Sequence, residues 1–218
     1  MIEKYFLTGL CVTWSPPAGG SQRAGAPDGS IIDNPPVGTP AMVYDYMDGE
    51  MYDLTAPHVK TVGLSKAMHI PHDWLVYAAG YTTKMPLLSD TLTGYMSGCP
   101  IVVWSKNGAQ NVGHVGTSNE YPQFNGAVKT AIGAELPNSA TGFFPAAAWS
   151  KDEQADAASK FKKVAVIPRI LALVTSTGTF YSILMMQRSK PLTEFVVAGI
   201  RKVGALDGSA LKAELAKK

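Results

Sequence analysis

The chain has little cysteine, little charge and no long hydrophobic run. Two of its 218 residues are cysteine and 17% are charged, with 19 basic side chains against 17 acidic ones. Two cysteines cannot form a disulfide scaffold, so Cys11 and Cys99 are interpreted as free thiols in a reducing compartment. A formal charge of +2 without a dense basic stretch gives little attraction for nucleic acid. We therefore expect no nucleic-acid partner.

Membrane and export signals are also absent from the sequence. No apolar run reaches the roughly 18 to 20 residues that span a bilayer. Glu3 and Lys4 precede a very short apolar stretch, which is unlike a cleaved secretory signal. Neither an internal repeat nor a Pro/Ser-rich linker divides the chain. These absences predict a single domain over residues 1–218 without a membrane partner, and we expect that domain to be a monomer.

Glycine and proline, by contrast, are abundant. The chain has 21 Gly and 15 Pro together with 46% hydrophobic residues, which is typical of a loop-rich globular protein with a sizeable core. The densest concentration lies in residues 15–40, where regular structure is not expected. This Pro/Gly-rich loop is interpreted either as a mobile lid or as a solvated surface loop.

Most of the remaining chain is predicted to form strands. Aromatic and β-branched residues bounded by turn residues predict strands at 5–14, 59–64, 74–79, 164–175 and 179–187. Pro168 favours an edge position or a bulge in the fourth of these. Asp48-Gly49, between residues 41–47 and 50–54, is typical of a hairpin with a type I′ turn.

Helices are predicted between and after the strands. Ser150 followed by Glu153 forms a capping box that opens a helix reaching residue 162. Further helices are expected near residues 192–203 and 209–217. Strands followed by helices within one chain predict the α+β class.

A second hairpin carries the candidate chemistry. Asn107-Gly108 lies between an apolar run at residues 100–104 and another at 110–115. A two-residue turn there places Ile101 opposite His114, and Cys99 two positions farther along the same face. Diagonal neighbours of this kind have backbones roughly 7 to 8 Å apart, so their side chains are within contact range.

Cys99 and His114 form a candidate nucleophile and base. A free thiol with a pKa of about 8.5 is mostly protonated at neutral pH, and a neighbouring imidazolium favours the thiolate. His114 would act first as a base and then as an acid. Gly98 and Gly116 would leave space beside the sulfur, and Gly98 would let the Cys99 amide point at a developing oxyanion. The alternative is a cysteine and a histidine that merely pack in the core.

These residues resemble a known family of toxins. Ser97-Gly98-Cys99, Val102-Val103, Lys106, Gly108 and His114-Val115-Gly116-Thr117 are similar to the catalytic signature of the cytotoxic necrotizing factor deamidase domain, including the Cys-to-His spacing. The segment Tyr95-Met96-Ser97-Gly98-Cys99 also resembles the motif of the Burkholderia lethal factor, a single-domain relative. The resemblance covers about 25 residues of 218, from Thr93 to Thr117.

The resemblance implies a sandwich of mixed β-sheets flanked by helices and long loops, and a glutamine deamidase acting on a protein. By that resemblance Cys99 is the nucleophile, His114 is the base and acid, and Thr93, six positions before Cys99, is the third catalytic group. Ser97, Gly98 and Gly116 would line the oxyanion and substrate side. Pro100, directly after Cys99, cannot contribute to an oxyanion site because it has no amide hydrogen to donate. No cofactor is implied.

The expected partner is thus a protein substrate, such as a GTPase or a translation factor, that carries the target glutamine. The resemblance implies a bacterial effector toxin that leaves the bacterial cytoplasm by a non-Sec route and acts in the host cytoplasm. Two alternatives stay open: a glutamine deamidase of the chemotaxis-receptor type, and a non-catalytic binding module.

One further cluster was considered for metal binding. His69 and His72 are three residues apart, with Asp73 adjacent. Zinc sites usually need three or four well-spaced ligands, and Pro71 prevents a regular helix that would align the two imidazoles. We therefore expect no metal site.

Overall fold

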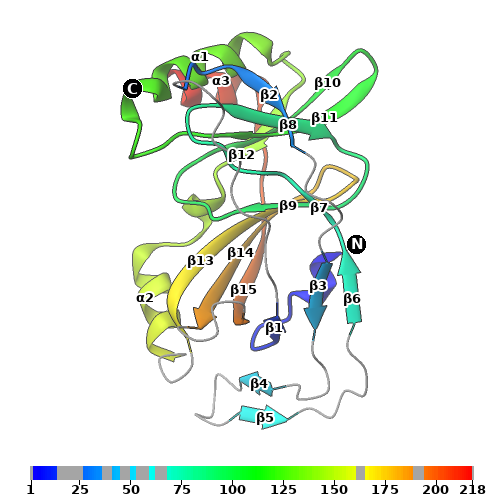
Figure 1. Ribbon diagram of the computed structural model, residues 1–218, viewed down its shortest axis with the longest axis vertical. Helices are drawn as coiled ribbons and strands as arrows, with labels where there is room; N and C mark the ends of the chain where they lie inside the picture. The colour runs from blue at the N-terminus through cyan, green and yellow to red at the C-terminus, as the bar shows by residue number, and fades with distance from the viewer. Residues whose placement is uncertain are drawn as a thin grey trace.

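Two mixed β-sheets packed face to face organise the protein. The computed structural model describes residues 2–13, 27–35, 41–44, 50–52, 59–61, 68–160, 165–188 and 194–217. Within these residues the two sheets, three α-helices and three short 3-10 helices form an α+β sandwich, as predicted. Figure 1 shows one sheet with α1 and α3 in the upper half, and the other with α2 in the lower half.

The larger sheet, called here the long-strand sheet, has eight described strands. Their order is β6 (Met68–Pro71), β3 (Ala41–Tyr44), β1 (Cys11–Thr13), β15 (Glu194–Val203), β14 (Phe180–Arg188), β13 (Ala165–Val174), β9 (Thr91–Gly94) and β7 (Asp73–Trp74). All neighbours are antiparallel except β7, which runs parallel to β9.

The second sheet, called here the hairpin sheet, has six described strands. Their order is β16 (Leu206–Asp207), β12 (Thr141–Phe143), β10 (Ile101–Lys106), β11 (Ala109–Val115), β8 (Thr82–Pro86) and β2 (Ile31–Asp33). Here β2 runs parallel to β8 and the other pairs are antiparallel. A separate two-stranded ladder joins β4 (Glu50–Tyr52) to β5 (Val59–Thr61).

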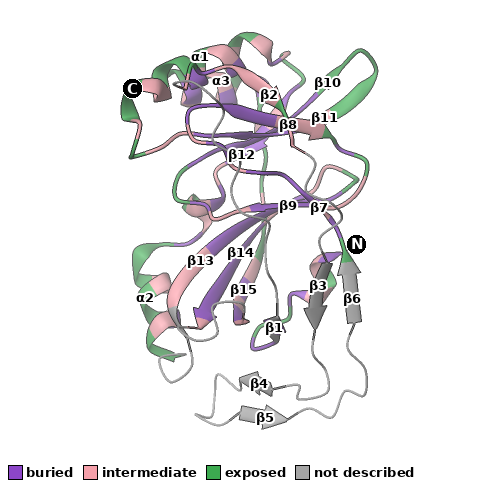
Figure 2. Ribbon diagram, in the orientation of Figure 1, coloured by how far each residue is buried: buried purple, intermediate pink, exposed green. Residues whose placement is uncertain are grey.

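Side chains that point inward from alternate positions of the strands fill the space between the two sheets. Ile101 and Val103 of β10 face the same buried cluster as Ile170 and Ala172 of β13. Full burial of one such aliphatic side chain contributes about 1.5 to 3 kcal/mol. Figure 2 shows the central strands of both sheets as largely buried. The inter-sheet layer is therefore the main core, and the candidate site lies within it.

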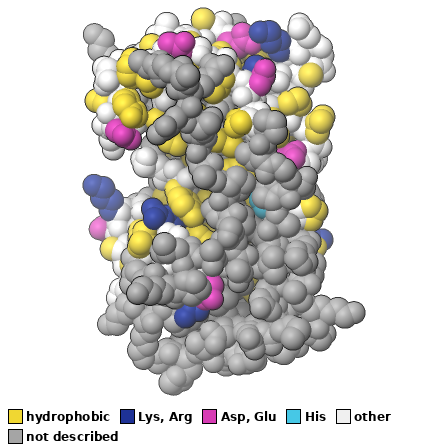
Figure 3. All heavy atoms as spheres, viewed as in Figure 1, with side chains coloured by type: hydrophobic (Ala, Val, Ile, Leu, Met, Phe, Trp, Pro, Cys, Tyr) yellow, Lys and Arg dark blue, Asp and Glu magenta, His cyan; other side chains and the backbone are white. Residues whose placement is uncertain are grey.

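The outer faces of the sheets are covered by helices. Val102 and Trp104 of β10 pack against α1 (Asn125–Glu135) and α3 (Gly208–Ala216). On the outer face of the long-strand sheet, residues of and beside the 3-10 helix η1 (Ile2–Tyr5) pack onto β13. On the face shown in Figure 3, the Lys, Arg, Asp and Glu side chains drawn are scattered rather than gathered by sign.

Several predicted elements are confirmed. The strands expected at 164–175 and 179–187 are β13 and β14, and the terminal helix is α3. A register shift at the start of β13 adjoins Pro168, which lies outside the stretch of β13 paired with β9. The Ser150 amide donates to Glu153 at 2.8 Å and the Glu153 amide to Ser150 Oγ at 3.1 Å, so the predicted capping box opens α2 (Lys151–Lys160).

The helix predicted near residues 192–203 is wrong, because this segment is strand β15. Phe195 and Val197 face the outer cluster, whereas Val196 faces the inter-sheet cluster. Both faces of this central strand are buried, so its apolar run lacks the polar alternation that marks an exposed strand. The helix α1 was not predicted from the sequence.

The hairpin predicted across Asp48-Gly49 is also wrong in its pairing. β3 pairs with β1 and β6, whereas β4 pairs with β5. β3 thus has partners distant in sequence and β4 pairs with the next strand, while the predicted turn itself lies outside the described residues. Of residues 15–40, the described part contains β2, so regular structure occurs where none was expected.

Two other predicted strands are shorter than expected. The segment at 5–14 begins with η1 and turns at Gly9, whose φ is 90°, before β1 starts. The segment at 74–79 continues β7 for only one residue. Its backbone then bonds to a side chain instead, because Val76 donates to Asn34 Oδ1 at 2.8 Å and Asn34 Nδ2 donates to the Trp74 carbonyl at 2.9 Å.

Candidate functional site

The hairpin that carries the candidate residues forms in the predicted register. Strands β10 and β11 pair so that Ile101 lies opposite His114. The turn residues Asn107 and Gly108 have φ values of 52° and 78°. Two successive positive φ values define the type I′ turn, whose twist matches that of the flanking strands. The local sequence therefore fixes the position of His114.

Cys99 and His114 both belong to the layer between the sheets. His114 is fully buried at 0% exposure, and Cys99, on the connection from β9 to β10, is 3% exposed. Cys99 packs in the same cluster as Ile101, the residue opposite His114. The two side chains are thus on the inter-sheet face of the hairpin sheet, as predicted.

Thr93 connects His114 to the other sheet. It lies on β9 of the long-strand sheet, next to Leu92, which faces the opposite side. Thr93 Oγ1 is 2.7 Å from His114 Nδ1, although 21 residues separate them. Both side chains are at least 99% buried, so this polar pair is fully removed from water. The hydrogen bond fixes the ring of His114 across the sandwich.

The second nitrogen of His114 is unpaired. Nε2 is buried and has no hydrogen-bond partner among the described residues. When the ring proton is on Nδ1 and is donated to Thr93, Nε2 carries the free lone pair. The Tyr77 ring lies against the imidazole, with the ring centroids 5.2 Å apart. Buried nitrogens without a partner are costly and often mark functional positions.

The Cys99 thiol is hydrogen-bonded to Thr117. Cys99 Sγ donates to the Thr117 carbonyl at 3.2 Å, and Thr117 Oγ1 donates to Sγ at 3.4 Å. The Tyr77 hydroxyl donates to the same carbonyl at 3.1 Å. In the described part of the chain, no hydrogen bond joins Sγ to His114. The thiol therefore points to Thr117 in this conformation.

Burial keeps both candidate groups neutral. It raises the pKa of the Cys99 thiol, an effect opposed by the hydrogen bond from the Thr117 hydroxyl. It also lowers the pKa of His114 to about 3. The expected thiolate–imidazolium pair is therefore wrong for this conformation, because the charged forms of both groups are disfavoured away from water. A neutral imidazole is nevertheless the form that acts as a base.

The predicted lining residues have different surroundings. Ser97 and Gly98 are exposed, and a β-carbon built on Gly98 would meet no atom within 4 Å. The expectation that Gly116 lines open space is wrong. Its amide donates to the Tyr81 carbonyl at 2.8 Å, and a β-carbon there would overlap the carbonyl oxygens of Ala78 and Tyr81. The space beside Gly116 is filled by the neighbouring backbone.

The buried neutral His114 should make stability fall in acid. In the unfolded chain this histidine takes up a proton as the pH falls through 6.5, whereas in the folded protein it does so only near 3. The unfolded state therefore gains a proton over that interval. Between pH 7 and pH 4 we expect this group to remove about 3 kcal/mol from the free energy of unfolding.

Urea unfolding at the two pH values measures this effect. His114→Gln is the matched control, because its amide does not titrate. The variant should lose less stability in acid than the wild type, and equal losses in the two proteins would contradict the buried neutral state of His114.

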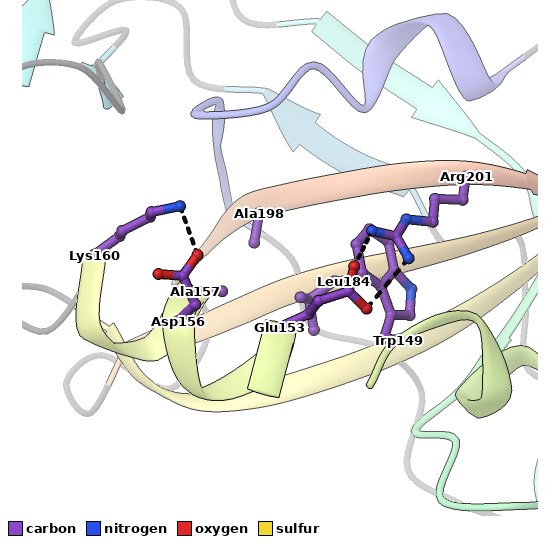
Figure 4. A pocket seen from close by; sticks show the side chains of 8 residues that line it. All are labelled: Trp149, Glu153, Asp156, Ala157, Lys160, Leu184, Ala198 and Arg201. Atoms are coloured by element: carbon purple, nitrogen blue, oxygen red, sulfur yellow. Dashed lines mark hydrogen bonds and ion pairs between the residues drawn. The ribbon is translucent and has the colours of Figure 1, made fainter. Parts of the chain in front are cut away.

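A hollow elsewhere on the surface is occupied by its own ion pairs. It lies over α2 and is lined by Trp149, Glu153, Asp156, Lys160 and Arg201, among others (Figure 4). Arg201 pairs with Glu153 and stacks 4.0 Å from the Trp149 ring centre, while Lys160 pairs with Asp156 at 2.5 Å. The Arg201–Glu153 pair joins α2 to β15, whereas the Lys160–Asp156 pair lies within α2, and we assign the hollow no ligand.

The described ranges hold no group of metal ligands and no membrane-spanning helix. Within them, no three His, Cys, Asp or Glu side chains are grouped so as to hold a metal ion. No helix there combines the length and the apolar character needed to cross a bilayer.

Comparison with known proteins gives no relative. No family model matches the chain, and no curated protein or solved structure matches it significantly. Function is therefore inferred from the residues themselves.

Two residues of this site, Tyr77 and Thr117, were not singled out from the sequence as functional. Thr117 was noted only as the end of the motif that begins at His114. Extending the hairpin register would place Thr117 opposite Gly98 and on the other face from Cys99, so the register does not indicate its contact with the sulfur. No local signal indicates Tyr77, because it reaches the site from the irregular segment after β7.

Proposed function

We propose that the protein is a cysteine-dependent protein glutamine deamidase, with Cys99 as nucleophile, His114 as base and acid, and Thr93 as the group that orients His114. The observation that carries the proposal is the 2.7 Å contact between Thr93 Oγ1 and His114 Nδ1. This contact joins the two sheets through the two residues to which the family resemblance assigns the base and the third catalytic group. It leaves His114 Nε2 without a hydrogen-bond partner among the described residues. A nucleophile, a base and a group orienting the base are the elements of this chemistry.

The reaction starts from the neutral pair. Rotation of the Cys99 side chain would move Sγ from the Thr117 carbonyl toward His114 Nε2, which accepts the thiol proton as sulfur attacks the carboxamide carbon. The carbon–sulfur bond forms as the carbonyl electron pair moves to oxygen. Collapse of this intermediate breaks the carbon–nitrogen bond, and ammonia leaves with the proton from His114. Water then hydrolyses the thioester to glutamate and restores the thiol.

Access to the sulfur is proposed from the side of Gly98. The exposed Ser97 and Gly98 adjoin Cys99 in the chain, whereas the thiol bonds to the half-buried Thr117, whose carbonyl also accepts from Tyr77. A protein loop carrying glutamine would enter beside Gly98, where no side chain obstructs it. If an amine reached the thioester before water, it would take up the glutamyl group as an amide, which is transglutamination, and the thiol would be released.

Burial favours a second candidate function, a non-catalytic binding module with a structural Cys/His pair. His114 has no exposed surface and Cys99 has little. In that case the thiol would resist alkylation over the whole pH range, whereas a nucleophile that reaches His114 reacts with iodoacetamide at neutral pH. This measurement separates the two functions without a protein substrate.

Deamidation is tested directly by mass spectrometry. We expect the protein to convert one glutamine of a host GTPase or translation factor to glutamate, a gain of about one dalton, because water replaces the departing ammonia. In water labelled with oxygen-18 the gain rises to about three daltons, which excludes earlier spontaneous deamidation. Lysates in which no peptide acquires the label would contradict the proposal.

The biological setting is proposed from the family resemblance alone. A deamidase of this kind would be a bacterial effector toxin, delivered by a non-Sec route into the host cytoplasm. Replacing a neutral glutamine by a charged glutamate would disable a catalytic or interface glutamine of the target.

A further inference from the structure

Acyl transfer through Cys99 requires donors for the oxyanion. The tetrahedral intermediate carries a negative oxygen, and removal of one donor from such a site typically costs about 10²- to 10³-fold in rate. Two hydrogen bonds are the usual arrangement. Pro100, directly after Cys99, has no amide, so the next backbone group in the chain cannot supply one of them.

The Cys99 amide is available as the first donor. Among the described residues it donates to no other residue. It also lowers the pKa of its own thiol, a weaker effect than that of Thr117, so it already stabilises negative charge at the sulfur. The amide belongs to the same residue as the attacking sulfur, so it is close to the place where the oxyanion of a bound acyl group would form.

The Thr117 hydroxyl is positioned to be the second donor. Its Oγ1 donates to Cys99 Sγ at 3.4 Å in the resting conformation. The oxyanion forms two bonds from the sulfur, after Sγ has turned toward His114. The Thr117 hydroxyl would follow by rotation about its own Cα–Cβ bond and donate to that oxygen. The Thr117 amide donates to the Val115 carbonyl at 2.8 Å, although the Thr117 backbone also lowers the pKa of the thiol, whereas the hydroxyl donates to the sulfur itself.

The segment that carries Thr117 is anchored on both sides. Before it, Gly116 is paired with the backbone of Tyr81 and Gly80, each at 2.8 Å. After it, the Ser118 amide donates to Asn125 Oδ1 at 2.8 Å, and Asn125 Nδ2 donates to the Ser118 carbonyl at 3.1 Å. The backbone that carries the donor is therefore held in place during the reaction and only the hydroxyl has to turn, which keeps the reorganisation at the oxyanion site small.

Tyr77 fixes the same peptide from the third side. Its hydroxyl donates to the Thr117 carbonyl at 3.1 Å, and its ring lies 5.2 Å from that of His114. When Sγ rotates toward His114, this bond still holds the Thr117 carbonyl in place. Tyr77 is therefore a positioning residue for both the base and the donor.

We propose that the Thr117 hydroxyl and the Cys99 amide together form the oxyanion site of this enzyme. The inference rests on the proposed function, because it requires acyl transfer through Cys99. In this arrangement the Thr117 hydroxyl takes the place expected for Gly116, whose amide is bonded to the Tyr81 carbonyl. It also supplies the second hydrogen bond, which Pro100 cannot donate.

The test compares two reactions of the same thiol. Iodoacetamide alkylates sulfur by displacement of iodide, without an oxyanion. 4-Nitrophenyl acetate acylates it: the sulfur–carbon bond forms, the electron pair moves to the carbonyl oxygen, 4-nitrophenolate leaves, and water later hydrolyses the acetyl thioester. The ratio of the acylation rate to the alkylation rate therefore isolates stabilisation of the oxyanion from reactivity of the thiol.

In Thr117→Val, which keeps the branched shape but loses the hydroxyl, we expect this ratio to fall about 10²-fold. The alkylation rate should also rise at a higher pH than in the wild type, because the lost hydrogen bond from the hydroxyl lowers the pKa of the thiol. Thr117→Ser should keep a ratio near that of the wild type. Cys99→Ala gives the background, and circular dichroism confirms folding. If Thr117→Val does not fold, Thr117→Ala is compared with Thr117→Ser in its place.

An unchanged ratio in the variant that lacks the hydroxyl would overturn the role of Thr117, whatever the protein substrate. A reduced ratio in a protein that deamidates no glutamine would leave the oxyanion site standing and reject the glutamine substrate. Failure of Cys99 to react with either reagent would reject acyl transfer, and the oxyanion site with it.

Discussion

Cys99→Ala is expected to lose all deamidation activity, because no other thiol can form the thioester at this site. The described fold places this sulfur alone beside Thr117 and on the face of His114. Activity should fall to the rate measured without enzyme, which is followed by mass spectrometry of the substrate peptide. Cys11→Ala is the matched control, since it also removes one thiol, and it should retain full activity.

His114→Gln is expected to lower the deamidation rate about 10²- to 10⁴-fold, the usual contribution of a general base and acid. The double variant Cys99→Ala/His114→Gln should be no less active than Cys99→Ala, because the two groups act in one step and their effects do not add. If Cys99→Ala deamidated its substrate at the wild-type rate, Cys99 would be excluded as the nucleophile.

Thr93→Val is expected to reduce both activity and stability. The substitution keeps the shape of the side chain but removes the hydroxyl 2.7 Å from His114 Nδ1. A buried nitrogen left without its partner costs about 1 to 3 kcal/mol, measured as a lower free energy of urea unfolding. Because the ring is then free to turn, we also expect about a 10²-fold lower kcat.

Thr93→Ser is the control for this experiment. It retains the hydroxyl, so it should recover most of the lost activity even where the missing methyl lowers stability. A Thr93→Val protein that is destabilised but fully active would show that the hydrogen bond serves the core alone. That outcome would favour the non-catalytic binding module.

The neutral state of the pair changes how its reactivity should be measured. A preformed thiolate would already react with alkylating agents in mild acid, whereas burial raises the pKa of Cys99 and lowers that of His114. Reactivity should therefore rise toward neutral and alkaline pH. Rotation of the Cys99 side chain away from the Thr117 carbonyl would bring the sulfur to Nε2, so proton transfer and attack are coupled.

Local patterns predicted those elements whose partners lie nearby in the sequence. The Asn107-Gly108 turn, the Ser150–Glu153 capping box and the pairing of β13 with β14 each depend on residues only a few positions from the turn or cap. Prediction was wrong where a partner is distant. β3 pairs across the sheet with β1 and β6, and β15 is a strand because β14 and β1 border it on both sides.

The same distinction applies to the candidate site. Motif spacing and hairpin register gave Cys99 and His114 on one face, and the resemblance added Thr93. The tightly packed backbone around Gly116 and the contacts of Tyr77 and Thr117 depend on segments that no motif connects to the hairpin. These contacts decide where the thiol points in the resting protein.

The sequence by itself determined a type I′ hairpin that carries a histidine at a known position, with a cysteine at its entrance, because a two-residue turn permits only one strand register. Tertiary structure alone decided that Thr93 of one sheet meets His114 of the other, that Thr117 bonds to Cys99 and is held by Tyr77, and that burial favours the uncharged thiol and imidazole. The reason is physical: which faces of two sheets meet, and how much water they exclude, depends on the packing of the whole chain and not on any short segment of it.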